Sequence, residues 1–289
     1  MKKVFYVILV LSLSYAKLIS QIEGKMEDYS PTATQWLLNA VGDSGKTAIK
    51  SVYMIYCKKT ASKGSGFLLK DGPIITNEHV IRDCQANDII AISPTGVKFA
   101  IKDVKIDTAR DLAALIPQQK LSDGVLLGDD ADISAGEIVW TWGYPLGYNG
   151  PAPLLSVGYL SGFKAYKNNQ TSSNLVKHLV VNAAFNSGNS GGPLFRANSD
   201  KVIGVVVNKA LPLFTPFVKS AVEAFSKQSS GFQFSGTDAS GKPIEMSEAQ
   251  IVAEIVKSLR DMSQVMIGEA ISVSELEAFL NGNGITFSK

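Results

Sequence analysis

The middle of the chain, residues 49–207, consists of short apolar segments that are rich in β-branched residues and separated by turn residues. Ile89–Ile92 and Val202–Val207 are almost entirely aliphatic, and Asp71-Gly72-Pro73 is one of the intervening turns. Short strands at such regular spacing are typical of antiparallel barrels or a sandwich. We therefore expect an all-β core. The predicted strands are residues 51–57, 66–69, 74–76, 89–92, 97–104, 113–116, 138–142, 156–163, 179–184 and 202–207.

A helical pattern precedes this region, at residues 31–41. Shortly after it, Gly45-Lys46-Thr47 invites comparison with a phosphate-binding loop. The first glycine of that motif would have to stand at position 40, which is Ala40, and no strand precedes it. We therefore reject a nucleotide site here.

The C-terminal part has a different pattern. A Ser- and Gly-rich stretch, residues 228–243, predicts a linker or loop. Ser247 and Gln250 then have the spacing of a capping box and predict the start of a helix, and residues 274–280 predict a second one. We expect the apolar side of the first helix to pack on the chain's own β core, or alternatively on a partner subunit. That side carries Ile251, Ile255, Leu259, Met262 and Met266.

The first residues have the pattern of a signal peptide. Lys2 and Lys3 precede an apolar run at residues 4–13, and small residues follow it. The run is too short to span a bilayer comfortably. We predict cleavage after Ala16 and no stable membrane insertion afterwards, with an uncleaved anchor as the alternative.

The composition excludes some classes of protein but does not indicate a function. The 289 residues are 45% hydrophobic and 19% charged, which is typical of a globular protein of one large or two modest domains. A net charge of +2 without a basic block gives no indication of nucleic-acid binding. Cys57 and Cys84 permit one disulfide in an exported protein, or remain two buried thiols. Without metal-ligand spacing we expect no metal site.

Candidate chemistry begins with Ser190, which lies among Gly188, Gly191 and Gly192. A serine hydroxyl becomes an effective nucleophile only when a base takes its proton and donors stabilise the resulting oxyanion. Gly188 permits a turn that exposes backbone N–H groups, and the two later glycines let the chain bend away. Alone, the stretch would equally suit a plain turn between strands. The interpretation as a nucleophile therefore requires a histidine and a carboxylate elsewhere in the chain.

The chain has two histidines. His79 follows a predicted strand pair and enters a short helical turn, whereas we interpret His178 as an ordinary loop or strand-edge residue. A catalytic histidine needs a carboxylate that holds its tautomer. Asp111, directly before a predicted apolar strand, is our candidate. The competing carboxylates without a comparable context are Asp103, Asp107 and Asp129.

The order His79, Asp111, Ser190 is that of the chymotrypsin-type triad. In their surroundings these motifs resemble a trypsin-like serine protease of the HtrA/Deg type, over roughly residues 50–225. The resembling segments are residues 64–80, 110–115, 126–147 and 182–194.

This resemblance implies two antiparallel six-stranded β-barrels, the chymotrypsin/trypsin-like fold, with a short helical C-terminal extension. It implies peptide hydrolysis through an acyl-enzyme, with Ser190 as nucleophile, His79 as base and Asp111 as its orienting acid. The backbone N–H groups of Gly188 and Ser190, with Asn189 between them, would form the oxyanion hole. No metal or cofactor is implied.

The implied domain organisation follows the same boundaries. We expect a signal peptide (1–16), a helical lead-in (17–47), a protease domain (48–226), a linker (227–246) and a helical extension (247–289). The two barrels would divide near residue 125. The residues after 225 are too few and too helical for the C-terminal peptide-binding PDZ domain that such proteins usually carry.

The resemblance also places the primary specificity pocket at Ala184, Val206 and Asn208. Because no acid stands at position 184, a basic side chain at the cleavage point is not favoured, and we expect a small or aliphatic preference. The implied partners are protein or peptide substrates, in a periplasmic or secreted location, with a homo-oligomer through the C-terminal helix left open. The alternatives are a catalytically weak chaperone or binding protein of the same fold, and an esterase that uses the same triad.

Overall fold

The computed structural model describes residues 31–146, 148, 150, 152–167, 175–197, 199–207, 216–229, 231–237, 243–262 and 267–289. The predicted signal peptide and its cleavage site lie outside these residues. The chain divides into two compact units, which are described separately. The larger unit contains two barrels, and the smaller one is built from residues between 211 and 263.

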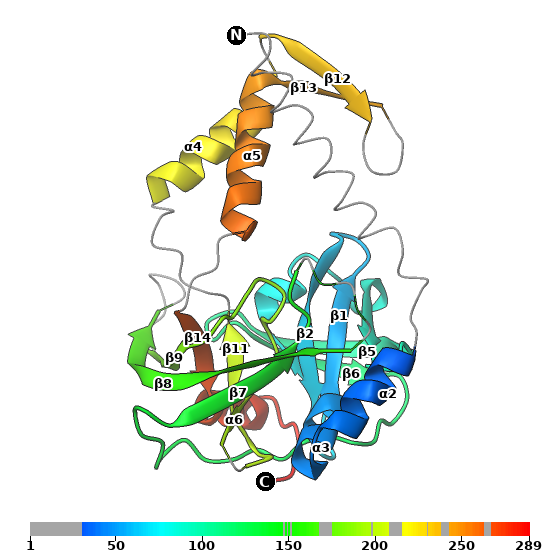
Figure 1. Cartoon of the computed structure of the whole chain (residues 1–289), viewed down its shortest axis with the longest axis vertical. Coiled ribbons are helices and arrows are strands. Elements are labelled where there is room, and N and C mark those ends of the chain that lie inside the picture. The colour runs from blue at the N-terminus through cyan, green and yellow to red at the C-terminus, as the bar shows by residue number, and fades with distance from the viewer. Residues whose placement is uncertain are drawn as a thin grey trace. The chain divides into compact units, whose positions relative to one another are not determined.

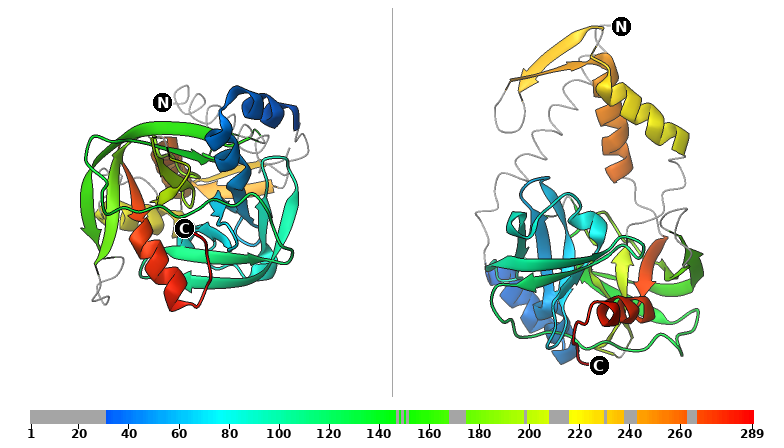
Figure 2. Two further views of the ribbon diagram at one scale, coloured as in Figure 1. Left: turned by 90° about the horizontal axis from the view of Figure 1, so that it is seen from below. Right: turned by 180° about the vertical axis from the view of Figure 1, so that it is seen from behind.

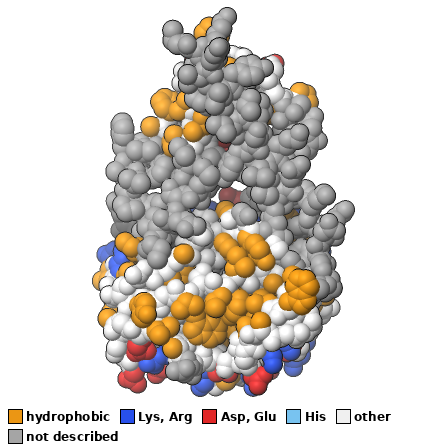
Figure 3. Space-filling view, in the orientation of Figure 1, with side chains coloured by type: hydrophobic (Ala, Val, Ile, Leu, Met, Phe, Trp, Pro, Cys, Tyr) orange, Lys and Arg blue, Asp and Glu red, His pale blue; other side chains and the backbone are white. Residues whose placement is uncertain are grey.

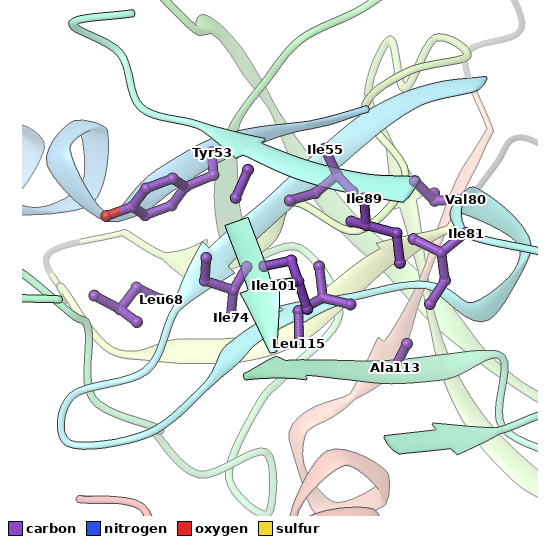
Figure 4. Close-up of a cluster of buried hydrophobic side chains, with 11 residues drawn as sticks. Tyr53, Ile55, Leu68, Ile74, Val80, Ile81, Ile89, Ile101, Ala113 and Leu115 are labelled. Atoms are coloured by element: carbon purple, nitrogen blue, oxygen red, sulfur yellow. The ribbon is translucent and has the colours of Figure 1, made fainter. Parts of the chain in front are cut away.

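The first barrel closes from six antiparallel strands in the order β1-β2-β3-β6-β5-β4 (Figure 1). Its interior is filled by a cluster of buried side chains, in which Ile55, Ile74 and Leu115 are completely buried (Figure 4). Closure leaves no strand edge unpaired, which protects the short strands. All six strands were predicted, within a few residues at each end. They are β1 (Val52–Cys57), β2 (Ser62–Leu68), β3 (Ile74–Thr76), β4 (Ile89–Ile92), β5 (Lys98–Asp107) and β6 (Leu112–Pro117).

The second barrel also closes from six antiparallel strands, in the order β10-β11-β14-β9-β8-β7. Its core is a second buried cluster that includes Val139, Leu179 and Leu194. The predicted double barrel is therefore confirmed. The strands are β7 (Ile138–Gly143), β8 (Leu154–Tyr166), β9 (Val176–Asn182), β10 (Pro193–Arg196), β11 (Val202–Val207) and β14 (Gly268–Ser272).

The sixth strand of this barrel, β14, comes from the region that the sequence assigned to a helical extension, residues 247–289. It pairs with β11 on one side and β9 on the other, and all five of its residues are buried. Residues 208–267 therefore interrupt the second barrel between two neighbouring strands. Placing the end of the barrel near residue 226 was wrong.

The inserted smaller unit contains α4 (Pro216–Lys227), β12 (Gln233–Thr237), β13 (Pro243–Ser247) and α5 (Glu248–Met262). The capping box is confirmed, because Ser247 N donates to Gln250 Oε1 at 2.8 Å and Gln250 N donates to Ser247 Oγ at 3.3 Å. The predicted linker at 227–246 is wrong, because β12 and β13 pair there as an antiparallel hairpin. Helix α5 packs against α4 and β13 within this unit.

Short helices accompany the barrels. The predicted N-terminal helix is present as α2 (Pro31–Ala40), and Gly45-Lys46-Thr47 lies inside α3 (Asp43–Ser51), not in a phosphate loop. Helix α6 (Val273–Gly282) follows β14 and contacts β11 and β14 (Figure 2). Two 3-10 turns, η1 (Glu78–Val80) and η2 (Ala86–Asp88), lie between β3 and β4.

One outer strand surface departs from the usual polar-out alternation. The outward residues Leu155, Val157 and Tyr159 of β8 are 49%, 55% and 55% exposed. Figure 3 shows hydrophobic side chains gathered on the face of the molecule where β7 and β8 lie in Figure 1. Antiparallel strands normally present polar residues on such a face.

Among the described residues, no helix is long and apolar enough to cross a membrane.

Cys57 and Cys84 form a disulfide, with their Cα atoms 6.3 Å apart and a sequence separation of 27. The bond ties β1 to the segment between η1 and η2. It therefore restrains the part of the first barrel that carries His79. On the chain-entropy model, closing a loop of this length stabilises a fold by about 3–4 kcal/mol.

We predict that the Cys57→Ala/Cys84→Ala double variant loses about 3–4 kcal/mol of unfolding free energy, because its unfolded chain is less restrained. Urea unfolding followed by circular dichroism measures the loss. Wild-type protein unfolded under a reducing agent is the control and should show a similar decrease. Equal stability of oxidised wild type and double variant would contradict the prediction.

Candidate active site

The first residue of the site is His79, which is the middle residue of η1, shortly after the end of β3. Its Nδ1 lies 2.7 Å from Asp111 Oδ2, and its backbone N donates to Asp111 Oδ1 at 2.9 Å. The side chains of His79 and Asp111 are 31% and 17% exposed, so the pair is partly shielded from water. One carboxylate thus binds both the ring and the backbone of the histidine.

Asp111 occupies the turn between β5 and β6, with a φ of +57° that non-glycine residues adopt rarely. Its carbonyl oxygen accepts from Asn77 Nδ2 at 2.9 Å and from Glu78 N at 3.3 Å. Hydrogen bonds on both its backbone and its side chain therefore hold this strained residue. They all come from the segment around His79.

Ser190 lies in the turn between β9 and β10, and it is 4% exposed. Gly188 and Gly191 on either side of it have φ values of +94° and +87°. Gly191 N donates to Val206 O and Val206 N donates to Gly192 O, each at 2.8 Å. The serine turn is therefore fixed along β11 of its own barrel.

Ser65 of β2 attaches this turn to the first barrel. Its backbone N donates to Ser190 O at 2.8 Å, and its hydroxyl donates to Gly188 O at 2.7 Å. The same hydroxyl accepts from Tyr144 N at 2.9 Å, and Ser65 is fully buried. Ser65 was not among the predicted site residues, although it stands between two glycines in Gly64-Ser65-Gly66.

Close backbone packing completes the approach of the two barrels. A Cβ added at Gly64 would lie 2.6 Å from the side chain of Val80, next to His79, and 3.3 Å from Ser190 O. A Cβ at Gly191 would lie 2.1 Å from Ser65 O. The structure therefore brings the segments of His79, Asp111 and Ser190 together. Ser190 Oγ and His79 are not hydrogen-bonded to each other within the described part of the chain, and such bonds often tighten only when substrate binds.

The backbone donors near Ser190 differ in their use. Asn189 N donates to Asn186 O at 3.0 Å. Among the described residues, the N–H groups of Gly188 and Ser190 donate to no acceptor. Two free N–H groups beside a serine hydroxyl are the arrangement that an oxyanion hole requires.

The predicted specificity residues have different positions. Ala184 is partly exposed, and its carbonyl accepts from Ser156 Oγ at 3.4 Å. Val206 is fully buried in the core of the second barrel, so only its backbone faces the serine turn. Its side chain cannot line a pocket, because alternate residues of a strand point to opposite faces. Asn208 lies outside the described residues.

The sequence suggested that His178 is a loop or strand-edge residue, and this is wrong. It lies in β9, between β8 and β14, and it is 5% exposed. Its Nδ1 lies 3.0 Å from Glu269 Oε2, and Glu269 Oε1 accepts from Lys164 Nζ at 2.7 Å. The hydrogen bond to His178 lowers the pKa of Glu269, and the bond to Lys164 adds to the effect while burial opposes it. The group formed by His178, Glu269 and Lys164 lies in the second barrel and contains no residue of the candidate triad.

In the part of the chain that the structure describes, no three His, Cys, Asp or Glu side chains are grouped so that they could hold a metal ion.

We predict that Gly191→Ala destabilises the protein more than Gly136→Ala. Both glycines have positive φ, +87° and +93°, so both variants incur the backbone cost of about 1–2 kcal/mol. Only at Gly191 would the new Cβ also clash, 2.1 Å from Ser65 O and 2.4 Å from Thr76 Oγ1, whereas nothing lies within 4 Å at Gly136. The clash should add about 1–3 kcal/mol, measured by urea unfolding. Equal losses would contradict the close approach of the barrels.

Comparison with known families gives a match over the part of the chain that contains these residues. Residues 64–205 match the model of the trypsin-like peptidase domain. This range contains His79, Asp111, Ser190 and the connection made by Ser65.

Two curated relatives are similar over this part of the chain. A "probable periplasmic serine endoprotease DegP-like" from Pseudomonas putida is 34% identical over 149 residues, which are 51% of this chain and 29% of the relative. "Protease Do-like 1, chloroplastic" from Arabidopsis thaliana is 32% identical over 168 residues, which are 56% of this chain and 36% of the relative. The chain thus spans only about a third of the length of these two relatives.

Solved structures share the fold. The active form of the Rv3671c protease from M. tuberculosis superposes with a TM-score of 0.58 at 17% identity, and covers 88% of each chain. The HtrA-type protease AlgW with a tripeptide gives 0.50 at 22% identity, and covers 67% of each chain. The match over residues 64–205 and the two closed barrels place a trypsin-like peptidase domain in this part of the chain, which is similar to DegP-like and HtrA serine proteases.

Proposed function

We propose that the protein is an exported serine endopeptidase that hydrolyses peptide bonds through an acyl-enzyme. The observation that carries the proposal is the 2.7 Å contact between His79 Nδ1 and Asp111 Oδ2, beside a serine turn with two free N–H groups. A carboxylate on Nδ1 leaves the other ring nitrogen, Nε2, as the base.

In this proposal Ser190 attacks the carbonyl carbon of the scissile peptide while His79 Nε2 takes the hydroxyl proton. The imidazolium then gives that proton to the leaving amine, and the acyl-enzyme remains on Ser190. Water attacks the acyl group in the second half, again with His79 as base. Asp111 stabilises the imidazolium in both halves, because its carboxylate accepts the Nδ1 hydrogen bond throughout.

The N–H groups of Gly188 and Ser190 would bind the oxyanion that each attack creates. Such donors are already oriented before the reaction, so they stabilise the developing charge without reorganisation. The positive φ of Gly188 supports this role, because it turns the backbone at that point. Its Cβ position, 2.4 Å from Tyr144 O, explains why a larger residue does not fit.

Protein or peptide substrates fit the names of the relatives, one of which is called a periplasmic serine endoprotease. The same name, together with the basic and apolar start of the chain, supports export through a signal peptide that is cut after Ala16. The proposed chemistry requires no metal or cofactor, because all proton transfers pass through His79.

For the primary site we propose a small or aliphatic preference, with Ala184 near its base. Ala184 offers no charge to pair with a basic side chain, and we assign the wall of the site to the backbone of β11 at Val206, which binds the serine turn. An apolar, uncharged site favours apolar side chains by the transfer energy of the buried groups.

We predict that a fluorophosphonate probe labels wild-type protein and fails to label Ser190→Ala, since only an activated serine reacts.

Asp111→Asn should lower the turnover of casein by about 10⁴-fold, through the wrong histidine tautomer. Asp103→Asn is the matched control, because the side chain of Asp103 is 52% exposed and pairs with Lys105. A folded wild-type protein that resists labelling would overturn the proposal.

We also predict that peptides with Val or Ala before the cleaved bond are turned over with a higher kcat/KM than the same peptides with Arg. One or two apolar groups in such a site are worth about 1–3 kcal/mol, or roughly 10–200-fold. Mass spectrometry of a peptide library digested by wild type, with Ser190→Ala as the blank, measures the preference. Preferential cleavage after Arg or Lys would contradict it.

A further inference from the structure

Arg110 directly precedes Asp111 and is held by two carboxylates. Its Nε donates to Glu275 Oε2 at 2.9 Å, and its Nη1 donates to Asp107 Oδ2 at 2.8 Å. Its backbone N also donates to Asp107 Oδ1 at 3.0 Å. Asp107 is local to the same turn, but Glu275 lies 165 positions later in the sequence, in the first turn of α6.

Glu275 joins the two barrels through its two carboxylate oxygens. Oε2 accepts from Arg110 of the first barrel, and Oε1 accepts from the backbone N of Lys177 in β9 of the second barrel, at 3.0 Å. The side chains of Glu275 and Arg110 are 16% and 23% exposed. Partial burial makes such a charge-assisted contact stronger and more specific than a surface pair.

The local sequence would allow Glu275 a different partner. Ser272-Val273-Ser274-Glu275 has the Ser-x-x-Glu spacing of a capping box at the start of α6. Ser272 occupies the N-cap position, but its side chain makes no capping hydrogen bond. Glu275 is therefore used for contacts between distant segments, and not to complete the local cap.

The contact acts on a strained position. Asp111 has a φ of +57°, and its carboxylate must meet both the ring and the backbone N of His79. Burial opposes the charge of Arg110, but the hydrogen bonds to Asp107 and Glu275 raise the pKa of its guanidinium above the ordinary value. A permanently charged Arg110 fixed from both barrels leaves the next residue little freedom to turn.

We propose that Glu275 is a positioning residue, which acts through Arg110 to hold Asp111 against His79. The assignment of Asp111 as the orienting acid rests on the proposed function, whereas the contacts of Glu275 stand on their own. In this way α6, which follows the inserted unit in the chain, takes part in building the site.

The test uses Glu275→Gln in the full chain. An amide has one acceptor oxygen, so its NH₂ group must face either Arg110 Nε or Lys177 N, both of which are donors. Glu277→Gln is the matched control, because Glu277 lies on the same helix and, among the described residues, pairs only with the exposed Lys289, at 2.8 Å. Proton NMR follows the Nδ1–H resonance of His79, identified by its loss in Asp111→Asn. The rate of fluorophosphonate labelling follows the reactivity of Ser190.

We expect Glu275→Gln to shift or broaden the His79 resonance and to slow labelling, by up to about 10²-fold, while Glu277→Gln leaves both unchanged. In the Asp111→Asn background, Glu275→Gln should slow labelling no further, since it acts through Asp111. A wild-type resonance in folded Glu275→Gln, an equal effect of Glu277→Gln, or an equal further loss in the Asp111→Asn background would each overturn the proposal. Should Glu275→Gln not fold, Arg110→Gln replaces it with the same expectations.

The NMR readout separates this proposal from the function. If wild-type protein were not labelled at all, the serine endopeptidase proposal would fail. The His79 resonance would still respond to Glu275→Gln if Glu275 positions Asp111, because the hydrogen bond between His79 Nδ1 and Asp111 does not require substrate.

Discussion

The site depends on one buried connection between the barrels, made by Ser65. Its backbone N and hydroxyl bind two carbonyls of the serine turn, and the hydroxyl also accepts from Tyr144 N. Fully buried polar groups of this kind are costly when unpaired and specific when paired. Here the hydroxyl both donates and accepts, so it fixes the serine turn relative to the barrel that carries His79 and Asp111.

Glycines make this connection possible by removing side chains where backbones touch. Gly191 has a positive φ and lies against Ser65 and Thr76. Both its backbone conformation and the lack of room for a Cβ therefore require glycine at this position. A Cβ at Gly64 would meet the side chain of Val80 in the same barrel, and would lie 3.3 Å from Ser190 O of the other barrel. The glycine-rich sequence around Ser190 is thus explained by contact between barrels as well as by the turn itself.

The sequence predicted the first barrel and the candidate triad because their signals are local. Strands such as Ile89–Ile92 are continuous aliphatic runs, and His79, Asp111 and Ser190 each lie in a recognisable motif. The hairpin of β12 and β13 was missed because Gln233–Thr237 has the Ser- and Gly-containing composition of a loop. Val206 was assigned to a pocket because sequence gives the position of a residue on a strand, but not which face its side chain occupies.

The strand β14 and Glu275 were missed for a deeper reason, which is that their partners are far away in the sequence. Gly268–Ser272 contains only two apolar side chains, yet it is buried because β9 and β11 flank it. The insertion of residues 208–267 separates it from β11, so its place in the barrel has no local signal. Glu275 follows directly, and its Ser-x-x-Glu spacing suggests a helix cap. Only the closed barrel shows that α6 starts where its first acidic side chain reaches both Lys177 N and Arg110. The last strand of the barrel therefore does more than close it, since it sets the position from which Glu275 contacts the neighbour of Asp111.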